Sequence, residues 1–149
     1  DGAQMCRTMA PQRLTGLSAE ADYEKGEDNH AEQALTQNID DTWNAGRAPT
    51  PGNPISLTVT LPGNQPTFID HLCLLPYQVP TSAATHHKVY VDDELVADLQ
   101  GATRHHHPMD PVPIGRPGRV VRIETVSSPS WVAWSQVQLF GNAPAPAAN

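Results

Sequence analysis

The sequence lacks the features that mark a membrane span or a nucleic-acid-binding surface. No apolar run approaches the roughly 20 residues that a helix needs to cross a bilayer. Nine Lys and Arg stand against 16 Asp and Glu, which gives a formal net charge of −7, and no basic cluster stands out. The charge balance therefore argues against a nucleic-acid backbone or an anionic membrane surface as the main partner.

Recognisable catalytic motifs are also missing. No G-x-S-x-G motif occurs, no Ser, His and acid stand in a familiar frame, and nothing selects a pair of glycosidase carboxylates. The histidines leave one alternative open. If residues 103–109 form a strand, His105 and His107 project from one face and are spaced to share a zinc ion, with Asp110 or His86 as a third ligand. Exposed strand histidines without a metal are the simpler interpretation, and we expect no enzyme activity.

Proline is abundant, whereas helix-forming patterns are scarce. Fifteen prolines in 149 residues are about twice the average share of roughly 5%. Proline is poorly tolerated inside helices and central strands, so this excess predicts many loops between short strands. The length is that of a single domain with a substantial core.

The C-terminal third shows the clearest strand pattern. Residues 119–126 alternate, with Val121 and Ile123 on one face and charged residues on the other, and residues 131–140 repeat this period of two. The short polar segment 127–130 between them predicts a hairpin-like connection.

Other segments support the same class of fold. A single helical turn is expected over residues 31–35 and a tight turn at Asp92-Asp93. Further strands are expected over residues 14–21, 55–61, 67–75, 86–92 and 94–99. Short strands with almost no helix predict an all-β protein, an antiparallel β-sandwich.

Several motifs resemble one family in their order and spacing. They are V-R-I at 121–123, W-V-A-W-S-Q-V-Q-L-F-G at 131–141, Q-A-L-T-Q-N-I-D-D-T-W-N-A-G at 33–46 and I-S-L-T-V-T-L at 55–61. Together they resemble the discoidin or coagulation-factor C-type domain family, which includes the family-32 carbohydrate-binding modules. The resemblance covers roughly residues 14–142 and implies a galactose-binding-like jelly roll. Residues 1–13 are then an N-terminal strap, and residues 143–149 a Pro/Ala-rich linker or tail.

The resemblance implies glycan binding through loops at one end of the sandwich, here residues 22–30, 43–54, 76–85 and 127–131. Sugars present apolar C–H patches and fixed hydroxyls, so a site needs an aromatic platform and planar hydrogen-bonding groups. The candidates in these loops are Tyr23, His30, Asn44, Arg47, Tyr77 and Trp131. Core packing remains an alternative for Trp131, and pairing with a nearby acid an alternative for Arg47. Trp43 and Trp134 are expected to pack in the core.

In the resembling family the loop over residues 34–42 often holds a structural calcium, through backbone carbonyls, an Asp and the Glu of a W-S-E ending. The corresponding ligands here are Ala34, Asn38, Asp40, Thr42 and Gln136. This sequence departs twice, because Thr-Gln replaces Asp-Gly at 36–37 and Gln replaces Glu at 136. Calcium affinity comes mainly from carboxylates, so a metal-free turn held by Asx-type hydrogen bonds is the alternative.

The two cysteines, Cys6 and Cys73, permit one disulfide. In the strand that the family suggests, Leu72 and Leu74 face the core and Cys73 faces outward, where an N-terminal strap can bring Cys6 to it. Two unrelated, partly buried thiols are the alternative. A disulfide fits an extracytoplasmic compartment.

The sequence thus predicts a non-catalytic, lectin-like module of a secreted or cell-surface protein, whose partner is a galactose-like or related sugar. A protein–protein or assembly module on the same scaffold is the alternative, because fold does not determine function.

Overall fold

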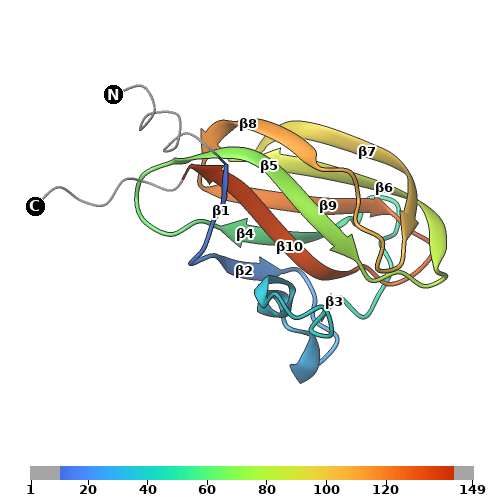
Figure 1. Ribbon diagram of the computed structural model, residues 1–149. Coiled ribbons are helices and arrows are strands. Elements are labelled where there is room, and N and C mark those ends of the chain that lie inside the picture. Colours follow the sequence, from blue (N-terminus) through green and yellow to red (C-terminus); the bar gives the residue numbers. More distant parts are fainter. Residues whose placement is uncertain (1–10, 143–149) are drawn as a thin grey trace, which may run out of the picture.

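The computed structural model describes residues 11–142 and shows two five-stranded antiparallel sheets packed face to face (Figure 1). Most of the predicted strap, including Cys6, and the predicted tail at 143–149 lie outside the described residues. The elements in chain order are β1 (Gln12–Arg13), β2 (Ser18–Ala21), the 3₁₀ helices η1 (Glu27–Asn29) and η2 (Ala31–Leu35), β3 (Trp43–Asn44), β4 (Ile55–Thr60), β5 (Thr67–Pro76), β6 (Ser82–Val91), β7 (Glu94–Arg104), β8 (Val112–Gly118), β9 (Val120–Ser127) and β10 (Ala133–Asn142).

One sheet has the order β1-β10-β5-β8, with β3 also paired to β10, and the other has the order β2-β4-β9-β6-β7. This arrangement confirms the predicted antiparallel β-sandwich. The expected helical turn is η2, and the expected tight turn at Asp92-Asp93 has positive φ at both residues. Gln12 and Arg13, which the sequence assigned to the strap, pair with β10.

The predicted hairpin near the C-terminus is wrong. Strand β9 lies between β4 and β6 in one sheet, whereas β10 lies between β1 and β5 in the other, so the loop at 128–132 crosses from one layer to the other. Both strands carry an apolar face, and each completes a different inner face of the sandwich. An alternating pattern predicts a strand but does not choose its partner.

The strand boundaries between residues 82 and 118 also differ from the prediction. Strand β6 begins four residues before the expected start at 86, so the loop before it is short. The sequence missed β8, which contains Pro113 and Pro117. Among the described strands β8 pairs only with β5, and such an edge position tolerates residues that cannot donate to a ladder.

The expected His-rich strand over 103–109 does not form. Strand β7 ends at Arg104, and the chain turns at His106, whose φ is +52°. His105 and His107 therefore do not share a strand face. Within residues 11–142, no group of three or more His, Cys, Asp or Glu side chains is placed to hold a metal ion.

The core fills the space between the inner faces of the two sheets. Trp43 and Trp134 are fully buried, as predicted, and Leu72 and Leu74 face inward. Burial of such side chains stabilises the fold by about 1.5–3 kcal/mol each. Cys73 lies on the partly exposed outer face, as expected, and burial raises the pKa of its thiol. It has no disulfide partner within the described part of the chain, and the predicted partner Cys6 lies outside that part.

A β-bulge sets which side chains of β5 enter the core. Ile69 and Leu72 both point inward although they are three residues apart, because the register shifts between Ile69 and His71. On the opposite strand the register shifts between Phe140 and Gly141. A Cβ atom on Gly141 would collide with the carbonyl oxygen of Phe68, so only glycine fits this close approach.

One histidine is part of the core, which the sequence did not predict. His87 is 4% exposed; its Nδ1 lies 2.8 Å from Thr125 Oγ1 and its Nε2 lies 3.0 Å from Thr103 Oγ1. The Trp134 ring lies beside it, with 5.0 Å between the ring centroids. In β6 the side chains alternate, and residue 87 falls on the same inward face as Val89.

The hydrogen bonds around His87 favour its neutral form. Thr85 Oγ1 donates to the Gly101 carbonyl, so its oxygen accepts from the hydroxyl of Thr103. Thr103 in turn accepts from His87 Nε2–H, and Thr125 donates to the unprotonated Nδ1. Burial lowers the pKa of His87 to about 4, and the charge of neighbouring His86 acts in the same direction.

This depressed pKa predicts an acid-sensitive fold. The unfolded imidazole has a pKa of 6.5 and the folded one a pKa of about 4, so protons bind the unfolded chain preferentially. The stability that neutral His87 contributes is fully present above pH 6.5. The free energy of unfolding falls by on the order of 3 kcal/mol as the pH approaches 4. Urea unfolding at a series of pH values measures this loss. His87→Gln is expected to be less stable at pH 7 but to lose less stability on acidification.

An exposed histidine outside the strands provides the control. His107→Gln is expected to keep the pH dependence of the natural protein. An unchanged pH dependence in His87→Gln would contradict the assignment of the effect to this buried imidazole.

Candidate functional site

Several loops meet at one end of the sandwich because every strand pairing is antiparallel. The C-terminal end of β5 lies beside the start of β10, and the end of β9 lies beside the starts of β4 and β6. This end is opposite to β1 and to the C-terminal end of β10 (Figure 1). The loops gathered here are residues 45–54, 77–81, 105–111 and 128–132, together with residues 22–30.

Backbone hydrogen bonds fix these loops to one another around the start of β10. The Ala45 N–H donates to the Val132 carbonyl at 2.8 Å, and the Val132 N–H donates to the Arg47 carbonyl at 3.2 Å. Two further bonds join the remaining loops, from Lys25 N–H to the Asn44 carbonyl at 2.7 Å and from Tyr77 N–H to the Ala133 carbonyl at 3.3 Å. The side chains of separate loops are therefore held in fixed relative positions.

Gly46 permits the close approach of the loop at 45–54 to the loop at 22–30. Its φ is +73°, a conformation that favours glycine. A Cβ atom there would lie 3.0 Å from Lys25 Cβ and 3.1 Å from Lys25 Cα. Gly46, the last residue of the motif at 33–46, is thus favoured both by its backbone conformation and by its close packing against Lys25.

An open pocket of about 250 Å³ lies among these loops. It contains three of the six predicted binding residues, Asn44, Tyr77 and Trp131. The Tyr77 side chain is 38% exposed and the Trp131 side chain 46% exposed, so neither is committed to the core. The full lining is Lys25, Asn44, Tyr77, Val79, Ser130 and Trp131.

The other three predicted residues do not line this pocket. Arg47 stacks on Tyr23, with its guanidinium carbon 3.9 Å from the ring centroid. The sequence left an acidic partner open as an alternative for Arg47. None of the ion pairs in the described part of the chain includes Arg47. His30 bonds to the Glu24 carboxylate through Nδ1 at 3.0 Å. Arg47 and Tyr23 thus contact each other, and His30 contacts Glu24.

Sequence reasoning did not single out Lys25, Val79 and Ser130, although all three lie in the loops that it named. Lys25 is the most consequential of them, because its Nζ lies 5.1 Å from the centroid of the Trp131 ring. This distance is within the range of a cation–π contact. An isolated lysine in a polar loop carries no pattern that separates it from a solvated charge.

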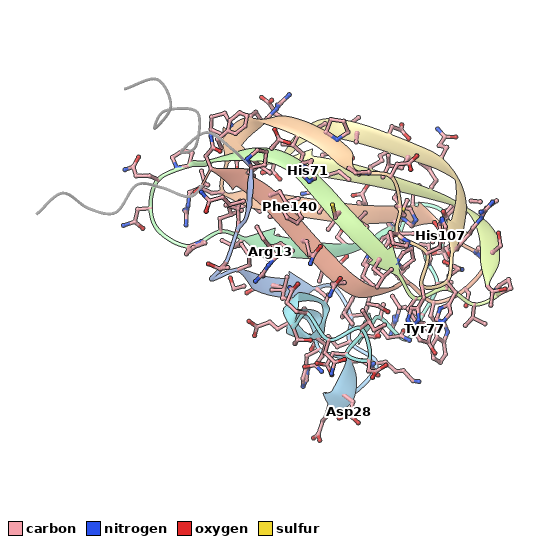
Figure 2. All side chains as sticks on the ribbon, viewed as in Figure 1. Arg13, Asp28, His71, Tyr77, His107 and Phe140 are labelled. Atoms are coloured by element: carbon pink, nitrogen blue, oxygen red, sulfur yellow. The ribbon has the colours of Figure 1, made fainter. Side chains whose placement is uncertain are left out.

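Local contacts orient two of the pocket side chains, Asn44 and Tyr77. The Asn44 Oδ1 accepts a hydrogen bond from the Gly46 N–H at 2.8 Å, which leaves the amide NH₂ group as the donor for a ligand. The Tyr77 ring meets the His105 and His106 rings edge-on, at centroid distances of 4.7 and 5.8 Å. Figure 2 shows Tyr77 and His107 at this end of the sandwich, away from Arg13.

The loop at 105–111, here called the histidine loop, therefore supports Tyr77 through packing. His105 Nδ1 accepts from the Gln78 N–H at 3.1 Å, so this nitrogen carries no proton. Burial, and then the charge of His106, lowers the pKa of His105. A neutral ring stacked against His106 at 3.9 Å forms the wall behind Tyr77.

A larger cavity of about 440 Å³ lies along β7 and the loop that follows it. Its lining includes Asp98, Gln100, Arg104 and Asp110, but no Trp, Tyr or Phe. It thus lacks the aromatic platform on which a sugar ring stacks. We therefore take the smaller, aromatic pocket as the candidate site.

The loop predicted to hold calcium is held by its own hydrogen bonds. The Asp40 N–H donates to Asn38 Oδ1 at 3.0 Å, and the Thr42 carbonyl accepts from the Asn29 amide at 3.0 Å. Thr36 Oγ1 donates to an Asp41 carboxylate oxygen at 2.7 Å. Of the five predicted ligands, Asn38 and Thr42 thus each use one oxygen as a hydrogen-bond acceptor, and the Asn38 bond is of the Asx type.

No protein-family model matches the sequence, and no curated protein matches it. Solved structures of several carbohydrate-binding modules resemble the fold. The family-32 carbohydrate-binding module of Clostridium perfringens NanJ, in complex with galactose, has a TM-score of 0.70 at 15% identity over 88% of this chain and 99% of that chain.

A second is the family-32 module of AlyQ in complex with 4,5-unsaturated mannuronic acid, with a TM-score of 0.65 at 13% identity over 87% of this chain and 98% of that one. A third is the Clostridium perfringens module CpGH89CBM32-5 in complex with GalNAc-β-1,3-galactose, with a TM-score of 0.67 at 14% identity over 87% and 100% of the two chains.

The chain has the fold of the family-32 carbohydrate-binding modules. This galactose-binding-like jelly roll is the fold that the sequence resemblance implied. Some structures with this fold also contain an enzyme domain, as in truncated AlyQ with its family-32 module and alginate lyase domain.

Calcium binding stays a prediction from the sequence resemblance, and the loop's hydrogen bonds do not favour it. Asp40 and Gln136 supply a single carboxylate between them, and calcium affinity depends on carboxylate charge. Binding to the folded state stabilises it by RT ln(1 + [L]/Kd), so a metal present well above its dissociation constant raises the melting temperature. We expect millimolar calcium and a chelator to give melting temperatures within about 2 °C of each other. A larger rise with calcium that Asp40→Asn removes would contradict this expectation and establish the site.

Proposed function

We propose that this domain binds a glycan through the pocket among its loops and has no catalytic role of its own. One observation carries the proposal. Separate loops bring Asn44, Tyr77 and Trp131 together around one open pocket, and the sequence had selected these residues for sugar recognition. The shared fold with sugar-binding modules supports the same proposal.

Each pocket residue has a role that follows from its chemistry. Trp131 and Tyr77 offer apolar ring surface to the C–H face of a sugar. The Asn44 amide donates to a ring hydroxyl, and the Ser130 hydroxyl donates or accepts. Val79, which is exposed, adds an apolar edge. The pocket is small and open, so it buries little ligand surface, and the affinity of a single site is weak.

The position of the pocket suits an accessory module. Gln12 pairs with Gly141, so both ends of the described chain lie side by side at the end of the sandwich opposite to the pocket. A domain joined there leaves the pocket open. None of the described helices is long and apolar enough to cross a membrane. Polymeric and conjugated glycans are met mostly outside the cytoplasm, so we propose a secreted or cell-surface location.

The solved neighbours bind different sugars, including galactose and 4,5-unsaturated mannuronic acid. The fold therefore accommodates several ligands, and the pocket lining selects among them. A galactose-like or related sugar is the ligand class that we propose.

A glycan screen tests the function directly. The purified domain is expected to bind a restricted set of glycans, and Trp131→Ala is expected to weaken binding by about tenfold, because it removes the largest aromatic surface of the pocket. Phe68→Ala is the matched control, since Phe68 is an exposed aromatic on β5 outside the pocket lining. It is expected to bind as the natural protein does.

The opposite results separate the two classes of function. Equal losses in both variants would indicate a general effect on folding and would contradict the assigned site. A folded domain that binds no glycan would contradict the proposal. The alternative, a protein–protein or assembly module, would then direct the search to protein partners.

A further inference from the structure

The candidate pocket carries a positive charge in a chain that is strongly acidic overall. The chain has a net charge of −7, yet the pocket lining contains Lys25 and no Asp or Glu. The other lining groups are an amide, two hydroxyl-bearing side chains, an indole and a valine. The local charge of the pocket is thus opposite in sign to that of the protein.

The Lys25 charge is not neutralised by a neighbouring carboxylate. None of the ion pairs within residues 11–142 includes Lys25. The adjacent Glu24 is engaged elsewhere, since its oxygens accept from the Ala31 N–H at 2.6 Å and bond to His30 at 3.0 Å. These two hydrogen bonds, the backbone one first, lower the pKa of Glu24.

The contacts of Lys25 hold its ammonium group beside the Trp131 ring in the pocket lining. Its backbone N–H is fixed to Asn44, its Cβ packs beside Gly46, and its Nζ lies over the Trp131 ring. An ammonium group over an indole keeps its full charge and its hydrogen-bond donors. A ligand that contacts the Trp131 ring therefore meets the Lys25 ammonium group beside it.

A second cation, Arg47, stacks on Tyr23 in the neighbouring loop and likewise has no carboxylate partner in the described ion pairs. Arg47 does not line the pocket, so Lys25 is the cation that a ligand bound there meets.

We propose that the pocket selects sugars that carry a carboxylate, namely uronic acid residues, over their neutral counterparts, and that Lys25 binds the carboxylate. The inference rests on the proposed glycan-binding function and specifies its ligand class. Lysine acts on an anion as a compact point charge on a flexible stem. The sugar ring contacts Trp131 and Tyr77, its carboxylate accepts from Lys25 Nζ, and the Asn44 amide donates to a hydroxyl.

The pocket volume of about 250 Å³ limits the selected unit to a small ligand. Sites for drug-sized ligands usually measure roughly 300–1,000 Å³. We therefore expect a single uronic acid residue, free or at the end of a chain, to occupy the pocket.

Matched pairs of sugars isolate the effect of the carboxylate. The dissociation constants of D-galacturonic acid and D-galactose, and of D-glucuronic acid and D-glucose, are measured by NMR titration at low salt. In one pair or both, the uronate is expected to bind about fivefold tighter, the size of an exposed charge pair. The difference is expected to shrink at about 1 M salt, where the Debye length is roughly 3 Å.

The two lysines of the chain provide the variant and its control. Lys25→Met keeps an unbranched side chain of nearly the same length but removes the charge, and it is expected to abolish the preference for the uronate. Lys25→Arg is expected to retain it. Lys88→Met makes the same change in net charge on β6, outside the pocket, and is expected to leave the preference unchanged.

Equal or tighter binding of the neutral sugars would overturn this inference while leaving the glycan-binding function intact. A preference for the uronate that survives in Lys25→Met would also overturn it. If none of the four sugars binds, the inference fails, and the wider glycan screen decides separately whether the domain binds other glycans.

Discussion

The pairing at the start of β10 is the constraint on which the functional end of this domain depends. At this point β10 pairs with both β3 and β5, while Val132 and Ala133 bond to the loops on either side. Directly beneath, Trp43 and Trp134 are buried side by side in the β3–β10 register. The pocket side chains stand on loops, but these loops are fixed by main-chain bonds to a strand at the centre of a sheet.

The same arrangement separates stability from recognition. Core side chains fill the space between the sheets, and the buried polar cluster around His87 is satisfied by threonine hydroxyls. The pocket residues remain partly exposed and contribute little to that core. Loops of this kind can change their side chains without repacking the sandwich, which agrees with the different sugars bound by solved neighbours at low sequence identity.

The fold was predictable from the sequence where periodicity carries information. The alternation in residues 119–126 and 131–140 gives two strands, because one face of each is buried. Their partners were not predictable, since β9 and β10 present similar inner faces to different sheets. Strand β8 was missed because its prolines argue against a central strand and say nothing of an edge. His87 was misjudged because two adjacent histidines in one strand must point to opposite faces, and the sequence does not say which.

The candidate pocket was predictable at the level of loops and less so at the level of side chains. The sequence selected Trp131, Tyr77 and Asn44 for the chemistry that sugar recognition needs, and the structure places all three around the candidate pocket. His30 and Arg47 have the right chemistry too, but Glu24 and Tyr23 engage them. Lys25 was overlooked because only the folded loops show its ammonium group above an indole.

The most direct test of the central claim is a map of backbone amide chemical shifts during titration with the tightest-binding sugar. If the pocket at the loop end is the binding site, the perturbed amides will cluster at residues 25, 44–46, 77–79 and 130–132. Perturbations concentrated along β7 and the loop after it, around the larger cavity, would contradict the account and place the site on the other side of the histidine loop.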